Sequence, residues 1–356
     1  MIIIMKKICL IGQFPPPIHG LSKALETLRK SEYLQGKFLL TCINITNNKK
    51  FMTHIQNIRK NESDVYYFTI SHSKLGNIRD LIILNELVKK NKKVIIHYHG
   101  GYFRQLYNEM NLIQKKINKS LLAKVDNVIV LSKGLSFLFK DLVEDHKIKV
   151  CENYVEDASL LSQDEFISKI RDTEKKTQID ILYLSNFIKS KGYLEVLEAA
   201  KKCKDKSVNF HFAGKFFSED EEHEFKKFIS IHGLNNVFFY GVVDGLEKKE
   251  LIKNSDVFIL PTYYHIEGQP ISLIEAMANG LTIITTNHAG IPDIVSKKNG
   301  YIIQAKNVGE IELAIQDLIS NRNKLIEFGY VNREHALLSF KEIDYIKRLE
   351  KIFNEV

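Results

Sequence analysis

The sequence of 356 residues predicts an α/β protein with two consecutive parallel-sheet halves. Short, β-branched apolar runs alternate with segments of helical periodicity along the chain, which is typical of βαβ units. The alternation stops in a polar segment over about residues 156–178 and then starts again, as expected at a domain junction. The length also fits two domains of about 150 residues or more each.

The runs predicted as strands are brief and almost continuously apolar, as strands buried on both faces of a sheet should be. In the first half they are Lys7–Ile11, Leu39–Ile43, Val65–Thr69, Val94–His97 and Val128–Leu131. In the second half they are Ile179–Leu184, Asn209–Ala213, Val237–Tyr240, Val257–Leu260, Thr282–Thr285 and Tyr301–Ile303. Helices are expected between them, with a last one over Phe340–Phe353. This pattern alone fits two Rossmann-like domains of any function.

The charge balance favours an anionic partner. Lys and Arg number 51 against 43 Asp and Glu, a formal net charge of +8, which suits nucleic acid, a phosphorylated substrate or an acidic membrane. The lysines are dispersed and form no basic stripe with interleaved aromatic residues, so we expect no nucleic-acid binding.

The chain is expected to work in the cytoplasm. The first apolar run is too short for a signal peptide, and no stretch approaches the roughly 18 apolar residues of a membrane span. The four cysteines are far apart in the sequence, which indicates neither a disulfide framework nor a zinc site.

Ligands of parallel sheets bind where strands end at their carboxyl edge. The loop after the first strand, Gly12–Ser22, contains three prolines and Gly20, which allows close backbone approach just before a helix. The amino end of that helix would suit an anion. The loop lacks G-x-G-x-x-G, so the dinucleotide fingerprint is missing, and a rigid turn capped by Ser22 is the alternative.

Two histidines follow the fourth predicted strand. His97 and His99 alternate with Tyr98, so both point to one side, and Gly100 and Gly101 leave room for a ligand beyond them. A histidine buried and hydrogen-bonded in the core is the alternative for each, and it is the stronger one for His97.

Two lysines follow the first strand of the second half. Lys189 and Lys191 stand beside Gly192 just before a helix, where cations would suit a diphosphate. Exposed lysines are common, so the alternative is an ordinary solvated surface.

The segment Glu267–Gly280 carries the strongest signal. Pro270 and Gly280 suit the start and end of a helix over about residues 271–279. Glu267 precedes this helix and Glu275 lies on it, where carboxylates accept hydrogen bonds from vicinal hydroxyls of a sugar. Acids stabilised by the helix dipole are the alternative, but an unpaired Glu275 among apolar neighbours would be costly.

Together these residues resemble family 4 of the glycosyltransferases, which are retaining enzymes of the GT-B fold. The resemblance covers nearly the whole chain and is carried by E-x7-E, Glu267 to Glu275, within EGQPISLIEAMANGLTIITTNHAGIPDIV. It implies two Rossmann-like domains facing each other across a cleft: an acceptor domain over residues 1–165 and a nucleotide-sugar domain over 166–338. A helix over 339–356 would return to the first domain.

The resemblance also implies roles for individual residues. Glu267 would contact the donor sugar, Glu275 the nucleotide ribose and Lys191 the leaving diphosphate. The implied catalytic residues are His99, Glu267 and Lys191. The implied donor-binding residues are Gly20, Asn186, Lys191, Glu267, Gly268, Gln269, Ile271, Ser272 and Glu275, and the acceptor-binding ones are His19, His97 and Gly100. Asn186 replaces the usual Arg, and Gln269 a frequent Phe.

The implied activity is transfer of a hexose, with retention, from a nucleotide-diphosphate sugar to a saccharide acceptor. A lipid-linked acceptor in surface polysaccharide synthesis (O-antigen, capsule or lipopolysaccharide) is expected. No D-x-D occurs in the chain, so we expect neither a metal nor another cofactor. A sugar-nucleotide epimerase and a non-catalytic sugar-nucleotide-binding protein on the same fold are the alternatives.

The segment Met110–Val125 combines four lysines with Ile113, Ile117 and Leu121 at helical spacing. A basic amphipathic helix of this kind suits the anionic inner face of a membrane. A solvated helix that packs through its apolar stripe is the equally weighted alternative.

Overall fold

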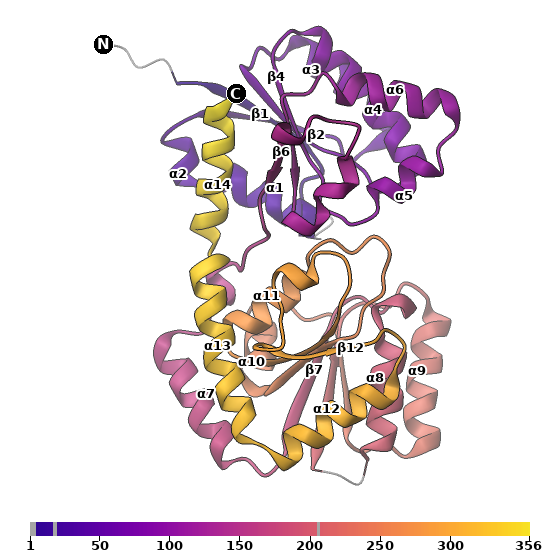
Figure 1. Ribbon diagram of the computed structural model, residues 1–356, viewed down its shortest axis with the longest axis vertical. Coiled ribbons are helices and arrows are strands. Elements are labelled where there is room, and N and C mark those ends of the chain that lie inside the picture. The colour runs from indigo at the N-terminus through magenta and orange to yellow at the C-terminus, as the bar shows by residue number, and fades with distance from the viewer. Residues whose placement is uncertain (1–4, 17–19, 205–206) are drawn as a thin grey trace. The chain divides into compact units, whose positions relative to one another are not determined.

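The computed structural model describes residues 5–16, 20–204 and 207–356. The chain divides into two compact units, named here the N-terminal unit (Met1–Glu152 with Ile343–Val356) and the C-terminal unit (Asn153–Glu342). Each unit contains a six-stranded sheet of parallel strands flanked by helices (Figure 1). The predicted α/β class with two parallel sheets is confirmed.

The N-terminal sheet has the order β2-β1-β3-β4-β5-β6, so the strand order reverses between β1 and β3. All five residues of β3 are buried, as expected for a central strand covered on both faces. The strands are β1 (Lys7–Gly12), β2 (Leu39–Asn44), β3 (Val65–Thr69), β4 (Lys93–His97), β5 (Asn127–Val130) and β6 (Ile148–Val150). The α-helices are α1 (Gly20–Lys30), α2 (Glu32–Gln35), α3 (Phe51–Lys60), α4 (Lys74–Lys89), α5 (Phe103–Asn108), α6 (Leu112–Leu122) and α14 (Glu342–Glu355).

Helix α14 packs on the N-terminal unit. The Phe353 ring meets the edge of Tyr67 at 5.6 Å between centroids, and Lys37 Nζ lies 2.5 Å from a Glu350 carboxylate oxygen. Its buried residues repeat at helical spacing (Tyr345, Ile346, Leu349, Ile352 and Phe353). The apolar stripe seen in the sequence therefore forms a packed face.

The C-terminal sheet has the order β12-β11-β10-β7-β8-β9. This is the 3-2-1-4-5-6 order of nucleotide-binding sheets, and it reverses between β7 and β10. The strands are β7 (Ile179–Leu184), β8 (Val208–Ala213), β9 (Val237–Gly241), β10 (Val257–Leu260), β11 (Thr282–Thr286) and β12 (Gly300–Ile303). The α-helices are α7 (Gln163–Lys175), α8 (Tyr193–Lys202), α9 (Glu219–His232), α10 (Gly245–Asn254), α11 (Ile271–Ala278), α12 (Val308–Ser320) and α13 (Asn323–Ser339).

Each of the eleven predicted strands forms, with ends that differ by no more than one residue from those expected. The polar segment over residues 156–178, in which the sequence shows little apolar periodicity, contains helix α7 over most of its length. Phe166 and Ile170 are buried, but Lys169 is buried between them and donates to carbonyls at the end of α10. Because this lysine lies on the packed face of α7, the apolar residues of the helix do not show a clear helical periodicity in the sequence.

Among the residues that the structure describes, no helix is both long enough and apolar enough to cross a bilayer.

Candidate functional site

The carboxyl ends of β7 and β10 bring two loops together where the C-terminal sheet reverses its strand order. The backbone N–H of Tyr263, after β10, donates to Ser190 O, after β7, at 2.7 Å. Ligands of doubly wound sheets bind at this position. The topology therefore selects the loops that the sequence singled out at Lys191 and Glu267.

Lys191 and Glu267 form an ion pair across these loops, with 3.3 Å between Nζ and Oε2. Their side chains are only 16% and 10% exposed, so the pair is screened from most of the solvent. The Thr262 hydroxyl also donates to Glu267 Oε2, at 3.5 Å. Gly192 follows the lysine with a φ of +82°, and a Cβ there would lie 2.6 Å from Pro261 atoms. Glycine is thus required for the backbone turn that presents Lys191.

Helix α11 starts at Ile271, four residues after Glu267. Pro270 is its N-cap residue and supplies no side-chain cap, so the first N–H groups remain for another acceptor. Ile271 and Ser272 are partly exposed at this end. Gly290 N–H donates to Gly268 O at 2.8 Å, which ties the loop before the helix to the rest of the unit.

Gln269 turns away from the amino end of α11 to bond Asn153. Its Oε1 accepts from the Asn153 backbone N–H at 2.6 Å, and its carbonyl accepts from the Asn153 side chain at 2.7 Å. Gln269 is 3% exposed. Gln269, which replaces a frequent Phe, therefore holds the loop before α11 in place through its hydrogen bonds to Asn153.

Glu275 lies about one turn into α11 and is 5% exposed. Its Oε1 lies 2.7 Å from Lys248 Nζ and 3.3 Å from the Ser159 hydroxyl. These partners offset the cost of burying the carboxylate. The sequence alone did not show whether Glu275 has such partners. Lys248 comes from α10 and Ser159 from the segment before α7, and no local pattern in the sequence pairs either with Glu275.

Asn186 and Lys189 lie in the same loop as Lys191. Asn186 is exposed, and its backbone carbonyl accepts from Ile188 N–H at 2.9 Å and from Tyr183 OH at 3.3 Å. Lys189 is 59% exposed and lies 3.5 Å from a Glu221 oxygen. Lys189 thus belongs to an ion pair at the surface.

In the N-terminal unit, His97 and His99 stack at the carboxyl end of β4, with ring centroids 3.8 Å apart. Tyr67 OH lies 2.5 Å from His97 Nδ1. Burial, and to a lesser degree the charge of His99, lowers the pKa of His97 well below its ordinary value. His97 is therefore neutral at physiological pH and supports the partly exposed His99 ring.

The remaining expected residues are placed as follows. Gly100 is buried and follows His99 directly, while Gly20 is the exposed first residue of α1. His19 lies outside the described residues. Across the described ranges, no group of three or more His, Cys, Asp or Glu side chains is arranged to hold a metal ion.

Residues 164–335 match the family model described as Glycosyl transferases group 1. This span lies inside the C-terminal unit and contains Lys191, Glu267 and Glu275. The C-terminal unit therefore carries a group 1 glycosyltransferase domain, which supports a transferase.

Three relatives match most of the chain. The uncharacterized glycosyltransferase MJ1069 of Methanocaldococcus jannaschii is 26% identical over 87% of this chain and 79% of its own length. An uncharacterized 41.2 kDa protein in the cps region of Klebsiella pneumoniae is 23% identical over 92% and 99%. A poly(ribitol-phosphate) alpha-N-acetylglucosaminyltransferase of Staphylococcus aureus is 24% identical over 88% and 67%.

The fold is also found in solved structures. The Anabaena protein Alr3699/HepE in complex with UDP superimposes with a TM-score of 0.77 at 14% identity, covering 99% of this chain and 100% of that chain. This likeness establishes the fold, which is that of the GT-B glycosyltransferases.

Proposed function

We propose that this protein is a retaining glycosyltransferase of family 4 that moves a hexose from a nucleotide-diphosphate sugar to a saccharide acceptor. The observation that carries the proposal is the screened Lys191–Glu267 ion pair beside the uncapped amino end of α11, inside a group 1 glycosyltransferase domain.

The C-terminal unit holds the donor. Lys191 and the first N–H groups of α11, at Ile271 and Ser272, bind the diphosphate and stabilise the charge that it gains as it leaves. Glu267 accepts hydrogen bonds from the donor sugar. Glu275 binds the ribose through Oε2, because its contacts among the described residues are made by Oε1.

The transfer follows a front-face displacement. The bond from the anomeric carbon to the diphosphate breaks, and a bond to the acceptor oxygen forms on the same face of the sugar. The acceptor hydroxyl gives its proton to the departing diphosphate, so no carboxylate has to act as a covalent nucleophile. In the N-terminal unit, we assign a catalytic role to His99, acceptor contacts to His97 and Gly100, and a donor contact to Gly20.

The acceptor is a lipid-linked saccharide of a surface polysaccharide. The names of two relatives, one from a cps region and one acting on poly(ribitol-phosphate), support the part of this assignment that concerns polysaccharide biosynthesis. A lipid-linked acceptor also implies that the protein works in the cytoplasm at the inner face of the membrane.

Transfer assays on a panel of UDP-, GDP-, ADP- and dTDP-sugars test the proposal. We expect one donor class to release its nucleoside diphosphate when a saccharide acceptor is present, and NMR of the product to show the anomeric configuration of the donor. An inverted product would refute the mechanism. Conversion of the donor to its epimer without any acceptor would identify an epimerase instead.

Metal independence is part of the proposal, because Lys191 and helix amides supply the charge that a divalent ion supplies elsewhere. Activity in excess EDTA is expected to equal activity in buffer. A loss of activity on chelation that Mg²⁺ restores would contradict the assigned role of Lys191.

A further inference from the structure

The exposed apolar side chains of the N-terminal unit are concentrated on two neighbouring helices. Six of the nine large apolar side chains that are exposed in its described part lie on α4 and α6. They are Leu75, Ile78, Ile82, Leu112, Ile113 and Ile117. Leu112 is 83% exposed and Ile113 is 74% exposed. Apolar residues gathered in this way on a surface mark an interaction site.

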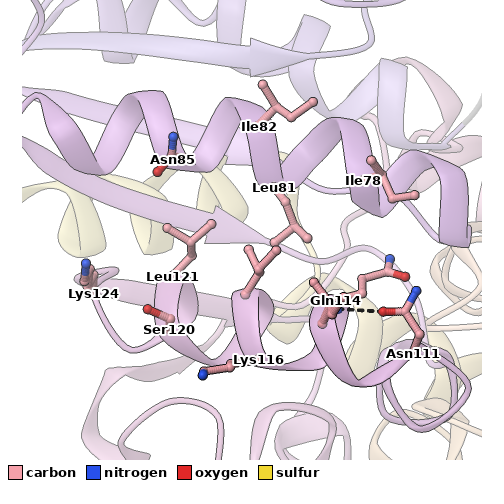
Figure 2. A pocket seen from close by; sticks show the side chains of 12 residues that line it. Ile78, Leu81, Ile82, Asn85, Asn111, Gln114, Lys116, Ser120, Leu121 and Lys124 are labelled. Carbon is pink, nitrogen blue, oxygen red and sulfur yellow. Dashed lines mark hydrogen bonds between the residues drawn. The ribbon is translucent and has the colours of Figure 1, made fainter.

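The two helices border an open groove of about 790 Å³. Figure 2 shows Ile78, Leu81 and Ile82 of α4 on one side and Leu121 and Lys116 of α6 on the other. Leu81 and Leu121 are buried at 8% and 7% exposure and form the base, whereas Ile78 and Ile82 stand open at 47% and 44%. The groove thus has an apolar floor and apolar walls.

The charge around the groove has one sign. Lys116 and Lys124 line it, and the segment 110–125 contains four lysines and no Asp or Glu. The acids on either side of this segment are already paired. Glu109 lies 3.3 Å from Lys74, and Asp126 lies 2.9 Å from Lys93.

The acids of α4 are engaged as well. Asp80 is buried and pairs with Arg79 at 2.8 Å, and Glu86 pairs with Arg59 at 2.7 Å. The described carboxylates on α4 and around α6 therefore leave the positive charge of the groove in place.

We infer that this α4–α6 face docks on an anionic lipid bilayer. The exposed isoleucines and leucines enter the boundary between headgroups and acyl chains, while Lys116, Lys124 and the neighbouring lysines bind anionic headgroups. The inference deepens the proposed function, on which it rests for its biological purpose, because a lipid-linked acceptor lies in a membrane.

A second copy of the chain fits the face less well. A symmetric dimer places the same patch on both sides of its interface. Lys116 and Lys124 would then approach the same lysines of the partner, and no acid of the segment 110–125 would be present to pair with them.

Co-sedimentation of the full chain with vesicles tests the inference. We expect binding to phosphatidylcholine vesicles that contain 30% phosphatidylglycerol, at least tenfold weaker binding to pure phosphatidylcholine, and weakening by 0.5 M NaCl, which screens the lysines. Lys116→Glu combined with Lys124→Glu is expected to lower the partition coefficient at least tenfold.

The apolar part is tested with Ile82→Ser, Ile113→Ser and Ile117→Ser in one variant, for which a tenfold loss of binding is expected. Matched controls lie on the C-terminal unit: Leu313→Ser with Leu338→Ser, and Lys175→Glu with Lys227→Glu. Leu313 and Leu338 are 64% and 75% exposed, so their replacement removes similar surface. Circular dichroism melting curves check that each variant folds.

Three results would overturn the inference: no binding of the wild type to anionic vesicles, equal loss in the controls, or a dimer in size-exclusion chromatography that the isoleucine variant converts to a monomer. Nucleotide binding, measured on the same preparations, tests the proposed function separately. Loss of vesicle binding with unchanged nucleotide binding concerns the α4–α6 face alone.

Discussion

The two units place different chemistry near the carboxyl ends of their strands. The C-terminal unit presents charge pairs, Lys191 with Glu267 and Lys248 with Glu275. The N-terminal unit presents two stacked imidazole rings, of which His97 is buried and hydrogen-bonded to Tyr67. Lysines suit the diphosphate of a donor, whereas imidazole rings and glycines suit the hydroxyl of an uncharged acceptor. In the proposed function, the two sheets therefore divide one reaction, with charged groups at one and imidazole rings at the other.

Charge pairs buried in this way contribute little to stability, because the desolvation cost offsets the attraction. In the proposed function, a ligand exchanges partners with these pairs. The histidine cluster of the N-terminal unit contributes through packing and through hydrogen bonds. Variants in the two units should therefore show their largest effects in different assays.

Lys191→Met is expected to have the largest effect. It removes the cation assigned to the leaving diphosphate, and the transfer rate should fall by about 10²–10³-fold, as when one transition-state donor is removed. Steady-state release of nucleoside diphosphate measures this. Lys189→Met serves as the matched control two residues away, and an equal loss in that control would contradict the assignment of Lys191.

Glu275→Gln is expected to weaken nucleotide binding about 10- to 100-fold, since a charged hydrogen bond to a ligand contributes roughly 1.5–3 kcal/mol. Titration calorimetry with the preferred nucleotide measures the affinity. His99→Phe, in the other unit, should leave this affinity within about twofold. Unchanged binding in Glu275→Gln would assign the glutamate to the Lys248 ion pair alone.

His97 should make stability depend on pH below its ordinary pKa of about 6.5. Burial lowers its pKa in the folded state, so the unfolded chain binds the extra proton and the free energy of unfolding falls as pH drops. The loss reaches at most about 1.4 kcal/mol per pH unit. Urea unfolding at pH 7.5 and 5.5 measures it.

His97→Phe should reduce this pH dependence, and His146→Phe at an exposed position should not. Burial also lowers the pKa of His335, so the quantity compared is the difference between the wild type and each variant. Equal pH dependence in the wild type and His97→Phe would show that His97 is not neutral in the folded protein.

The exposed pair Lys189–Glu221 should give the smallest effect. A double-mutant cycle with Lys189→Ala and Glu221→Ala is expected to yield a coupling of about 0.2–1 kcal/mol, as for other solvent-exposed pairs. Thermal unfolding measures the coupling. A larger value, together with reduced transfer, would mean that Lys189 supplies the charge missing at Asn186.

The strands could be predicted because each is a short, largely apolar run, a property that belongs to the residues of the run themselves. This holds even for the edge strands β2 and β9, which contain one buried residue and none, respectively. Helix α7 could not be predicted, since Lys169 interrupts its buried face and finds its partners on α10. Local periodicity reports burial only where the buried residues are apolar.

The candidate site shows the same limit. Lys191 and Glu267 were found because each lies in the loop that follows a strand, and the strand order then brings the two loops together. Lys248 was missed because it reaches Glu275 from a helix on another part of the fold, 27 residues away in sequence. Gln269 was identified as a site residue, but only the structure shows that its side chain bonds Asn153.

The most direct test of the account is a thermal-shift measurement with UDP-, GDP-, ADP- and dTDP-sugars on the wild type, Glu275→Ala and His99→Phe. The account predicts that one nucleotide class raises the melting temperature of the wild type and of His99→Phe but not that of Glu275→Ala. A shift that persists in Glu275→Ala, or the absence of a shift with every nucleotide, would contradict a donor site built on the C-terminal unit.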